Sequence, residues 1–421
     1  MIDVIGLGVT GLGVTDRPLL SNTAQLALEN AVVVIGSKRQ LQVVSYLLAN
    51  NQKQQQVILP PLAKLAQLLD ENKSVAIVML ASGDPLHYGI GRWLVKTVGL
   101  DQLNFHPAVS SMQAACHLLG ISLQDVDVLS LHGRPLEKIR SVLKVKKNLL
   151  VLTDKNSQPQ QLAQACLAAG FTQTSITVIE KIGYPEQNLR KFSLDELLNE
   201  NALSFDPLHV SLIEPQGLGG CLPEFPGFED QLFITGAEPG KGMITKREVR
   251  LAILSLLQPS HSDVIWDIGA GCGSVTIELA YWQKNAHIYA LEHHDQRLTC
   301  LRNNREKFGV RENVTIVAGR APEQLSSLPK ANKVFIGGSD GELQTILQIA
   351  WQQLPEHGLL VVSAVTENTK FQLQQFSQQL SHQQVETLQI AVSKGSHLAG
   401  QLMYKPNLSV TLYKFIKHGT E

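Results

Sequence analysis

The sequence lacks an excess of charge of either sign. Its 421 residues include 36 Lys and Arg against 37 Asp and Glu, which gives a formal net charge of −1. Proteins that bind nucleic acid or anionic membranes through general electrostatic attraction carry a basic excess. We therefore expect no nucleic acid and no membrane as partners, while a local basic pocket stays compatible with this balance.

Cysteines are few and scattered. Cys116, Cys166, Cys221, Cys272 and Cys300 are odd in number, and none belongs to a C-x-x-C pair. This pattern argues against a disulfide framework and against a zinc site. We expect reduced thiols, a cytoplasmic location and no bound metal.

Long hydrophobic runs are also missing. No apolar segment approaches the roughly 18 residues that span a bilayer, and Met1–Val4 has no basic flank typical of a signal peptide. With 44% hydrophobic and 17% charged residues, the composition is that of a globular protein. The length predicts two or three domains.

The most informative stretch lies near the start of the last third. Val264–Ile268 is an apolar run that predicts a buried strand, and Ser274–Ala280 has helical spacing. Glycines alternate with small residues between them, and Glu292 ends the next apolar run. A strand, a glycine-rich turn and a helix bring bare backbone close to a nucleotide-like ligand, and an acid on the second strand can bind ribose hydroxyls.

The spacing of this loop separates three interpretations. Dinucleotide sites favour G-x-G-x-x-G, whereas this loop reads acid-x-G-x-G-x-G, with Asp267 in front. The pattern resembles the S-adenosylmethionine (SAM) site of Rossmann-like methyltransferases. A dinucleotide site and a purely structural turn are the alternatives. The candidate cofactor-binding residues are Asp267, Gly269, Ala270, Gly271, Cys272, Gly273 and Glu292, with Cys272 interpreted as a packing residue.

The first half of the chain alternates predicted strands and helices, with small-residue loops after the strands Ile2–Leu7, Val75–Leu80 and Leu103–His106. This indicates an open, mostly parallel sheet with sites at the strand ends. Asn50–Gln56 is predicted to be a solvated connection. We expect an α/β fold with two domains. The first covers residues 1–215 and has two lobes, at about 1–130 and 136–215. A linker at 216–231, with the domain boundary near Gly220, leads to a seven-stranded domain at 232–421.

Several motifs in both domains are typical of known families. They are Gly242–Arg250, Asp267–Ser274, Gly319–Glu323 and Phe335–Gly338 in the second domain, and Gly6–Gly8, Ser82–Pro85 with Tyr88-Gly89, and His106-Pro107 with Ser110-Ser111 in the first. With these motifs the second domain resembles the decarboxylating precorrin methylases of cobalamin (vitamin B12) biosynthesis, and the first resembles the tetrapyrrole methylases. Together they resemble the fused precorrin-6Y C(5,15)-methyltransferases (decarboxylating).

The resemblance implies a tetrapyrrole methylase fold followed by a Rossmann-like methyltransferase domain, with SAM bound at two sites per chain. It implies methylation of an anionic precorrin at carbons 5 and 15, decarboxylation of the carbon-12 acetate, and homo-oligomers. Val9 and Thr10 replace the Pro-Gly that usually stands in the family's first loop. Further implied cofactor-binding residues are Gly6, Gly8, Ser82, Gly83, Asp84, Ser110, Ser111, Thr245 and Ala321.

A substrate with many carboxylates requires local cations in a protein of balanced charge. Lys246, Arg247 and Arg250 precede the SAM loop, and His132 and Arg134 are candidates in the first domain. Each could instead be an ordinary surface charge. No residue is singled out as catalytic, because an electron-rich macrocycle needs positioning more than a nucleophile.

Two other functions fit the residues less well. One is a SAM methyltransferase on another electron-rich small molecule, with a first domain that only binds or assembles. The other is an NAD-dependent oxidoreductase, for which the loop spacing is less suitable.

Overall fold

The computed structural model describes residues 1–8, 17–48, 54–199, 203–217, 223–380 and 384–418. The chain forms two compact units, residues 1–136 with 142–221 and residues 137–141 with 222–421. Gly220, Val9 and Thr10 lie outside the described residues. The predicted α/β fold class is confirmed, and the second unit contains the expected seven-stranded sheet.

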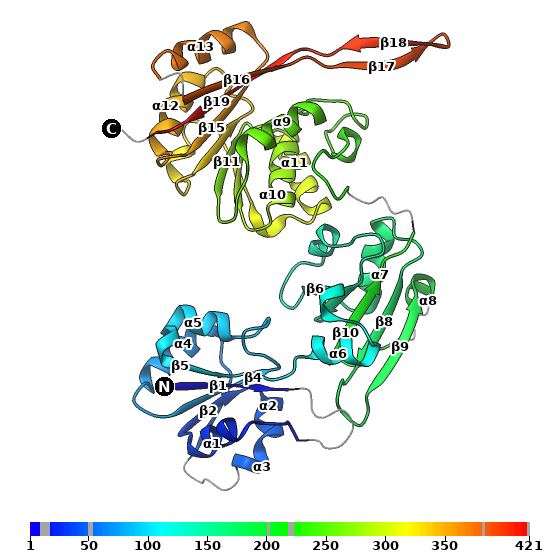
Figure 1. Cartoon of the computed structure of the whole chain (residues 1–421), viewed down its shortest axis with the longest axis vertical. Helices are drawn as coiled ribbons and strands as arrows, with labels where there is room; N and C mark the ends of the chain where they lie inside the picture. The colour runs from blue at the N-terminus through cyan, green and yellow to red at the C-terminus, as the bar shows by residue number, and fades with distance from the viewer. Residues whose placement is uncertain (9–16, 49–53, 200–202, 218–222, 381–383, 419–421) are drawn as a thin grey trace. The chain divides into compact units, whose positions relative to one another are not determined.

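The first lobe of the first unit is a parallel sheet in the order β3-β2-β4-β1-β5 (Figure 1). Leu28 and Leu41 pack α1 and α2 on one face, and Leu65 and Leu94 pack α4 and α5 on the other. The loops after β1, β4 and β5 therefore meet at one edge. The elements are β1 (Ile2–Leu7), α1 (Asn22–Asn30), β2 (Val33–Gly36), α2 (Lys38–Val43), α3 (Ser45–Leu48), β3 (Gln55–Ile58), α4 (Leu62–Glu71), β4 (Ile77–Ser82), α5 (Gly91–Val98) and β5 (Leu103–His106).

The prediction of a solvated connection over Asn50–Gln56 is wrong for its last two residues. Gln55 and Gln56 begin β3, which pairs with β2 at the edge of the sheet. Three of its four side chains are exposed, so the strand carries no hydrophobic pattern. Backbone pairing, which the sequence does not display, holds it in place.

The second lobe is a mixed sheet in the order β6-β7-β10-β8-β9. Strands β6 and β7 are parallel, whereas the remaining neighbours are antiparallel. Helix α6 buries Met112 and Ala115 against this sheet. The elements are α6 (Ser111–Leu119), β6 (Asp127–Ser130), β7 (Leu149–Leu152), α7 (Pro159–Ala168), β8 (Ser175–Glu180), β9 (Asn188–Ser193), α8 (Leu194–Asn199) and β10 (His209–Glu214).

The second unit has the sheet order β13-β12-β11-β14-β15-β19-β16, parallel as far as β15. Buried apolar side chains of α9, α10 and α11 cover one face, and those of α12 and α13 cover the other. The elements are α9 (Arg247–Leu257), β11 (Val264–Ile268), α10 (Ser274–Trp282), β12 (His287–Glu292), α11 (Asp295–Lys307), β13 (Val314–Ala318), β14 (Lys333–Ile336), α12 (Leu343–Gln353), β15 (Leu359–Ala364), α13 (Glu367–Ser377), β16 (Val385–Ile390) and β19 (Val410–Ile416).

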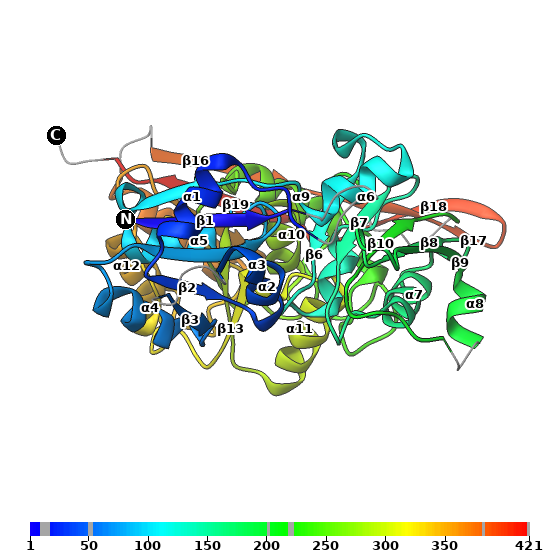
Figure 2. The ribbon, with the colours of Figure 1, turned by 90° about the horizontal axis from the view of Figure 1, so that it is seen from below.

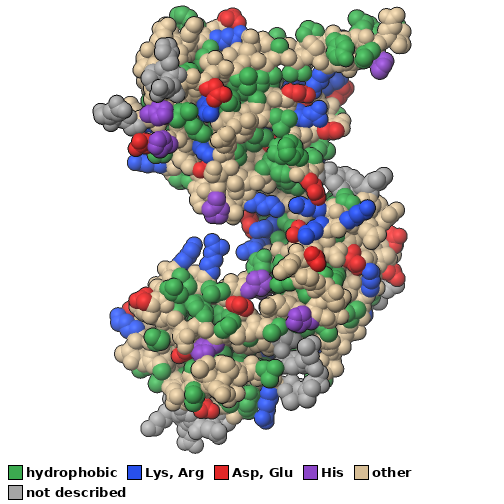
Figure 3. Space-filling model, viewed as in Figure 1, with side chains coloured by type: hydrophobic (Ala, Val, Ile, Leu, Met, Phe, Trp, Pro, Cys, Tyr) green, Lys and Arg blue, Asp and Glu red, His purple; other side chains and the backbone are tan. Residues whose placement is uncertain are grey.

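A two-stranded arm, β17 (Ser393–Leu398) with β18 (Gln401–Pro406), extends from this sheet (Figures 1 and 2). Figure 3 shows hydrophobic side chains along it. Tyr404 of β18 has 67% of its surface exposed. The sequence analysis did not predict these strands. Across the residues that the structure describes, no helix combines the length and the apolar character needed to cross a membrane.

A buried ion-pair network attaches the segment before α9 to helices α9 and α10. The fully buried guanidinium of Arg250 donates from Nε to Glu278 (2.6 Å) and from Nη1 to Asp230 (2.9 Å). It also donates to the carbonyl oxygens of Thr245 and Phe228. Glu278 in turn accepts from the backbone N–H of Phe228 (3.1 Å). Because each charge is paired and hydrogen-bonded, this burial is tolerated.

Replacing Arg250 with methionine leaves two carboxylates without their buried counter-charge. We expect Arg250→Met to lower the free energy of unfolding of the second unit by about 3–5 kcal/mol, measured by urea denaturation. Arg247→Met is the matched control, since that side chain is 43% exposed and its loss should cost about 0.5 kcal/mol or less. Equal stability of the two variants would contradict the role of the network.

Candidate functional site

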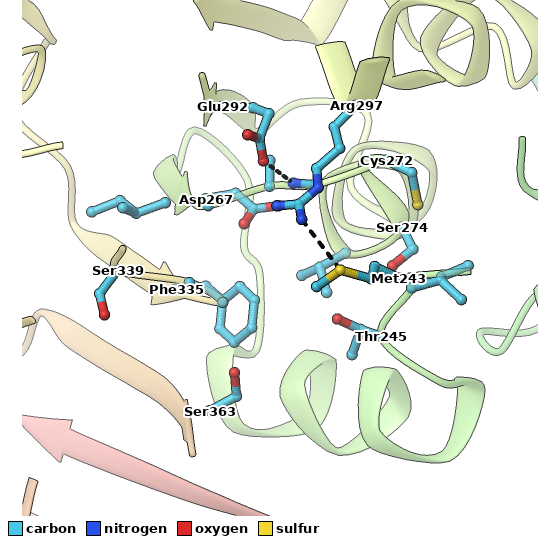
Figure 4. Close-up of a pocket in the computed structure, with 18 of the residues that line it drawn as sticks. Met243, Thr245, Asp267, Cys272, Ser274, Glu292, Arg297, Phe335, Ser339 and Ser363 are labelled. Atoms are coloured by element: carbon cyan, nitrogen blue, oxygen red, sulfur yellow. Dashed lines mark hydrogen bonds between the residues drawn. The ribbon is translucent and has the colours of Figure 1, made fainter. Parts of the chain in front are cut away.

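The glycine loop of the second unit opens onto a cavity of about 540 Å³ (Figure 4). Its walls come from the carboxyl ends of four neighbouring parallel strands and from the segment before α9. The roots of the β17–β18 arm complete it. The wall segments are 269–272 after β11, 292–293 at the end of β12, 319–321 after β13, 337–340 after β14, 242–246 before α9, and 392 with 407–408 at the arm.

Glycine is required in the loop for two different reasons. Gly269 has a φ of 71°, and a Cβ there would lie 2.6 Å from the carbonyl oxygen of Gly338, so close packing excludes a side chain. Gly271 also has a positive φ, 61°, but a Cβ there would meet no protein atom within 4 Å. Since Gly271 lines the cavity, its bare face leaves room for a ligand. This opening fits the SAM molecule that the sequence pattern predicts.

Glu292 is 3% exposed and is held by the backbone. Its Oε2 accepts from the N–H of Gly271 (2.9 Å), and its Oε1 accepts from the N–H groups of His293 and His294 (both 2.8 Å). A carboxylate has about four acceptor positions, so capacity remains for a ligand hydroxyl. Within the described ranges, no group of three or more metal-ligating side chains occurs.

Asp267 is the second buried carboxylate of the site, with 1% exposure. Thr276 donates its hydroxyl hydrogen to Oδ2, whereas Oδ1 lies buried without a hydrogen-bond partner. Burial, with a smaller contribution from the charge of Glu292, raises the pKa of Asp267 to about 6 against the opposing effect of the hydrogen bonds from Thr276. A buried, unsatisfied anion in a cavity wall is suited to a cationic ligand.

Cys272 lies inside the loop and its thiol is inert. Burial raises the pKa of Cys272 to about 11, so the thiolate that a nucleophile requires does not form near pH 7. Its carbonyl oxygen accepts from Asn304 Nδ2 (2.8 Å), and the same amide accepts from the N–H of Ile234 (2.8 Å). Asn304 thus fixes the loop to the chain segment before α9, a link that the sequence did not signal.

The cations before α9 occupy different places. Lys246 and Thr245 line the cavity, as does Ala321 across from them. Arg247 does not line it, and the prediction for Arg250 is corrected, because its fully buried guanidinium is committed to Glu278 and Asp230. A charged residue at the start of an amphipathic helix looks the same in the sequence whether it faces solvent, a ligand or a buried acid.

Other cavity residues were missed by the sequence analysis. Ser339 and Asp340 directly follow the Phe335–Gly338 motif, so their place after a parallel strand was a usable signal. Arg297 and Met243 contact each other through Nη2 and Sδ at 3.2 Å (Figure 4), and nothing in their spacing indicates this. The missed lining residues are Arg297, Ser339, Asp340, Ser363 and Asn407. Met243, Arg320 and Phe335 also line the cavity and lie within the family motifs, but they were not named as site residues.

The first unit has its own cleft, of about 800 Å³, between its two lobes. Gly8, Ser82, Gly83, Ser110 and Ser111 line it. These residues follow β1, β4 and β5, the three strand ends that meet at one edge of the first sheet. The loops predicted to hold SAM therefore lie together.

Two other predicted residues of this unit have structural contacts instead. Gly6 does not line the cleft; a Cβ there would lie 3.0 Å from the backbone nitrogen of Ala108. Asp84 also lies off the cleft, and its Oδ1 accepts from the N–H of Leu86 (2.8 Å), which shapes the turn. Ser110 lines the cleft and also caps α6 by accepting from the N–H of Gln113 (3.3 Å).

The far wall of the cleft belongs to the second lobe. His132 lines it, whereas Arg134 does not and donates to the carbonyl oxygen of Ser130 (3.2 Å). Arg39 reaches Ser82 Oγ (3.3 Å) from the first lobe. The sequence analysis missed the lining residues Arg39, Gln40, Thr153, Lys155, Lys181 and His209, which fall in segments without a recognisable motif. Tyr88 also lines the cleft and belongs to the Tyr88-Gly89 motif, but it was not named as a site residue.

The raised pKa of Asp267 predicts a pH dependence of stability. Its folded-state pKa of about 6 exceeds the unfolded value of about 3.9, so the stabilisation is complete below pH 4 and is lost as the pH rises through 6. The difference is about 3 kcal/mol. We expect Asp267→Asn to remove it, so that the variant gains stability relative to the wild type between pH 4.5 and 7.5. Urea unfolding of the ligand-free protein at both pH values measures this, and parallel pH profiles would contradict it.

Comparisons with known proteins agree with this arrangement. The family model described as "Precorrin methyltransferase domain" matches residues 239–417, and that described as "Tetrapyrrole (Corrin/Porphyrin) Methylases" matches residues 7–198. A precorrin-6Y C(5,15)-methyltransferase [decarboxylating] from Sinorhizobium sp is 31% identical over 99% of this chain and 96% of its own.

Two further relatives each cover less than half of this chain. A probable cobalt-precorrin-6B C(15)-methyltransferase (decarboxylating) from Methanothermobacter thermautotrophicus is 31% identical over 45% of this chain and 96% of its own. The crystal structure of a precorrin-6y C5,15-methyltransferase from Geobacter metallireducens is 37% identical, with a TM-score of 0.42, and covers 46% of this chain and 100% of its own. From its full-length relative and its two family domains, the chain belongs to the family of decarboxylating precorrin-6Y C(5,15)-methyltransferases.

Proposed function

We propose that this protein methylates a precorrin macrocycle at carbons 5 and 15 and decarboxylates its carbon-12 acetate, using SAM, in cobalamin biosynthesis. The observation that carries this is the cavity of the second unit, where the open face of Gly271 lies between the buried carboxylates of Asp267 and Glu292. Membership of the family supplies the substrate class.

Each unit holds one SAM molecule in this proposal, which gives two sites per chain. When bound, SAM supplies a methyl group activated on a positively charged sulfonium. In the second unit, Glu292 accepts from the sugar hydroxyls and the loop backbone lies against the ligand. In the first unit, the cleft residues Ser82, Gly83, Ser110 and Ser111 form the corresponding wall.

The remaining wall of the second cavity suits an anionic macrocycle. Lys246, Arg297 and Arg320 all line it and can pair with substrate carboxylates. Phe335 and Leu408 supply apolar surface for the ring and keep water away from the reacting carbon. The protein thus mainly orients the ring carbon and the acetate, and the conjugated ring accepts the electrons that decarboxylation releases.

The two reactions divide between the units in this proposal. The Methanothermobacter relative, which covers 45% of this chain, is named for carbon-15 methylation and decarboxylation, and the precorrin methyltransferase domain matches residues 239–417. We assign those steps to the second unit and carbon-5 methylation to the first. Homo-oligomerisation and a cytoplasmic location stay predictions from the sequence.

Isothermal titration with SAM tests the number of sites. We expect two molecules per chain in the wild type and one in Gly271→Val, because valine would project into the open side of the loop. Gly400→Val is the matched control, since Gly400 also has a positive φ, 80°, and open surroundings but does not line the cavity. One site in the wild type would favour the alternative in which the first unit does not catalyse.

The same variants test the division of labour. Incubation with the metal-free precorrin and SAM, followed by mass spectrometry of the products, reports decarboxylation and each added methyl group. We expect Gly271→Val to lose decarboxylation and carbon-15 methylation, at least 100-fold in rate, while Gly400→Val retains both. Full decarboxylation by Gly271→Val would place that step elsewhere.

A further inference from the structure

A hydroxyl and an imidazole form a pair on the wall of the first unit's cleft. Thr153 follows β7, and His209 begins β10, the neighbouring antiparallel strand. Thr153 Oγ1 lies 2.9 Å from His209 Nε2, and His209 Nδ1 lies 2.6 Å from the carbonyl oxygen of Asp206. Both residues line the cleft, although His209 is only 7% exposed. The SAM-binding motifs of the sequence include neither residue.

The partners fix the direction of both hydrogen bonds. A carbonyl oxygen can only accept, so His209 carries its proton on Nδ1 and donates it to Asp206. Burial lowers the pKa of His209, so the ring is neutral near pH 7 and Nε2 is an acceptor. The hydroxyl of Thr153 then donates to Nε2 at 2.9 Å, and the carbonyl oxygen of His209, at 3.4 Å, is its more distant acceptor. Its oxygen lone pairs remain available, and we infer that this point of the wall accepts a hydrogen bond from the ligand.

The charged groups near the imidazole do not reverse this neutral state. Asp206 and Glu180 act to raise the pKa of His209 but do not overcome the effect of burial. Lys181 lies 3.6 Å from the carboxylate of Asp206, and Arg190 lies 2.9 Å from that of Glu180. Both carboxylates are thus already paired with cations.

Methyl transfer in this cleft creates a need for a proton acceptor. The sulfur–methyl bond breaks with its electron pair remaining on sulfur, and a ring π pair forms the new carbon–carbon bond. The macrocycle gains one positive charge, which is delocalised onto a ring nitrogen and makes its N–H acidic. Neutrality returns when one proton leaves.

We propose that Thr153 accepts a hydrogen bond from a ring N–H of the macrocycle and relays its proton to His209 after methylation in the first unit. The ring proton moves to Thr153 Oγ1 as the hydroxyl hydrogen moves to His209 Nε2, which leaves a neutral methylated ring and an imidazolium. The assignment rests on the proposed function of this unit. Thr153 touches the substrate, and His209 acts through it as a positioning residue and final acceptor.

Thr153→Val tests the relay, because valine keeps the shape and removes the oxygen. We expect the rate of carbon-5 methylation to fall about 100-fold, within the range for removal of a proton-transfer group, while SAM affinity changes less than threefold. Thr153→Ser should restore the rate to within fivefold of the wild type. Thr177→Val is the matched control: Thr177 is 3% exposed on β8 of the same sheet and does not line the cleft.

The readout is the mass and methylation site of the product under single-turnover conditions from pH 5.5 to 8.5, with folding checked by circular dichroism. In the wild type, the rate of carbon-5 methylation should decrease at pH values below the pKa of His209. This decrease should be absent in Thr153→Val. If valine unfolds the unit, Thr153→Ala with the same two measurements replaces it. Wild-type-like methylation by a folded oxygen-less variant would overturn the relay alone, whereas a wild type that adds only one methyl group would overturn the proposed function and the relay with it.

Discussion

The guanidinium of Arg250 connects three parts of the second unit that are distant in the sequence. It binds Glu278 on α10, Asp230 in the segment before α9, and the carbonyl oxygen of Thr245 beside the cavity. One wall of the cavity is irregular backbone, and such a wall has no ladder of hydrogen bonds to define it. The buried guanidinium of Arg250 holds this wall in one position, because moving a partner carboxylate away from it would leave a buried charge unpaired.

The sequence predicted most of this fold because buried strands and their following loops carry strong signals. The regions Val264–Ile268 and Ser274–Ala280 appear as β11 and as part of α10. The failures have a common cause. Strands β3 and β18 lie at edges or project into solvent, with side chains largely exposed, so no pattern of hydrophobic residues marks them.

The residues of the candidate site also fall into two groups, those that local sequence patterns identify and those that they do not. Residues on strand-end loops, such as Gly271, Glu292 and Ser110, could be named from motifs because their spacing follows from the backbone geometry. The structural role of Arg250 could not be predicted, because Glu278, to which it donates, lies 28 positions later in the chain. The pairing of Thr153 with His209 spans 56 positions and depends on the register of two antiparallel strands, which no local pattern encodes.

The two buried carboxylates of the second cavity differ in one respect that bears on turnover. Glu292 is satisfied by three backbone donors, whereas Asp267 keeps one oxygen without a partner. A ligand that enters with a positive charge within reach of that oxygen is attracted, and the attraction weakens once the ligand has become neutral. For a molecule that gives up its charge together with a methyl group, the wall that favours binding of the donor thereby favours departure of the spent product.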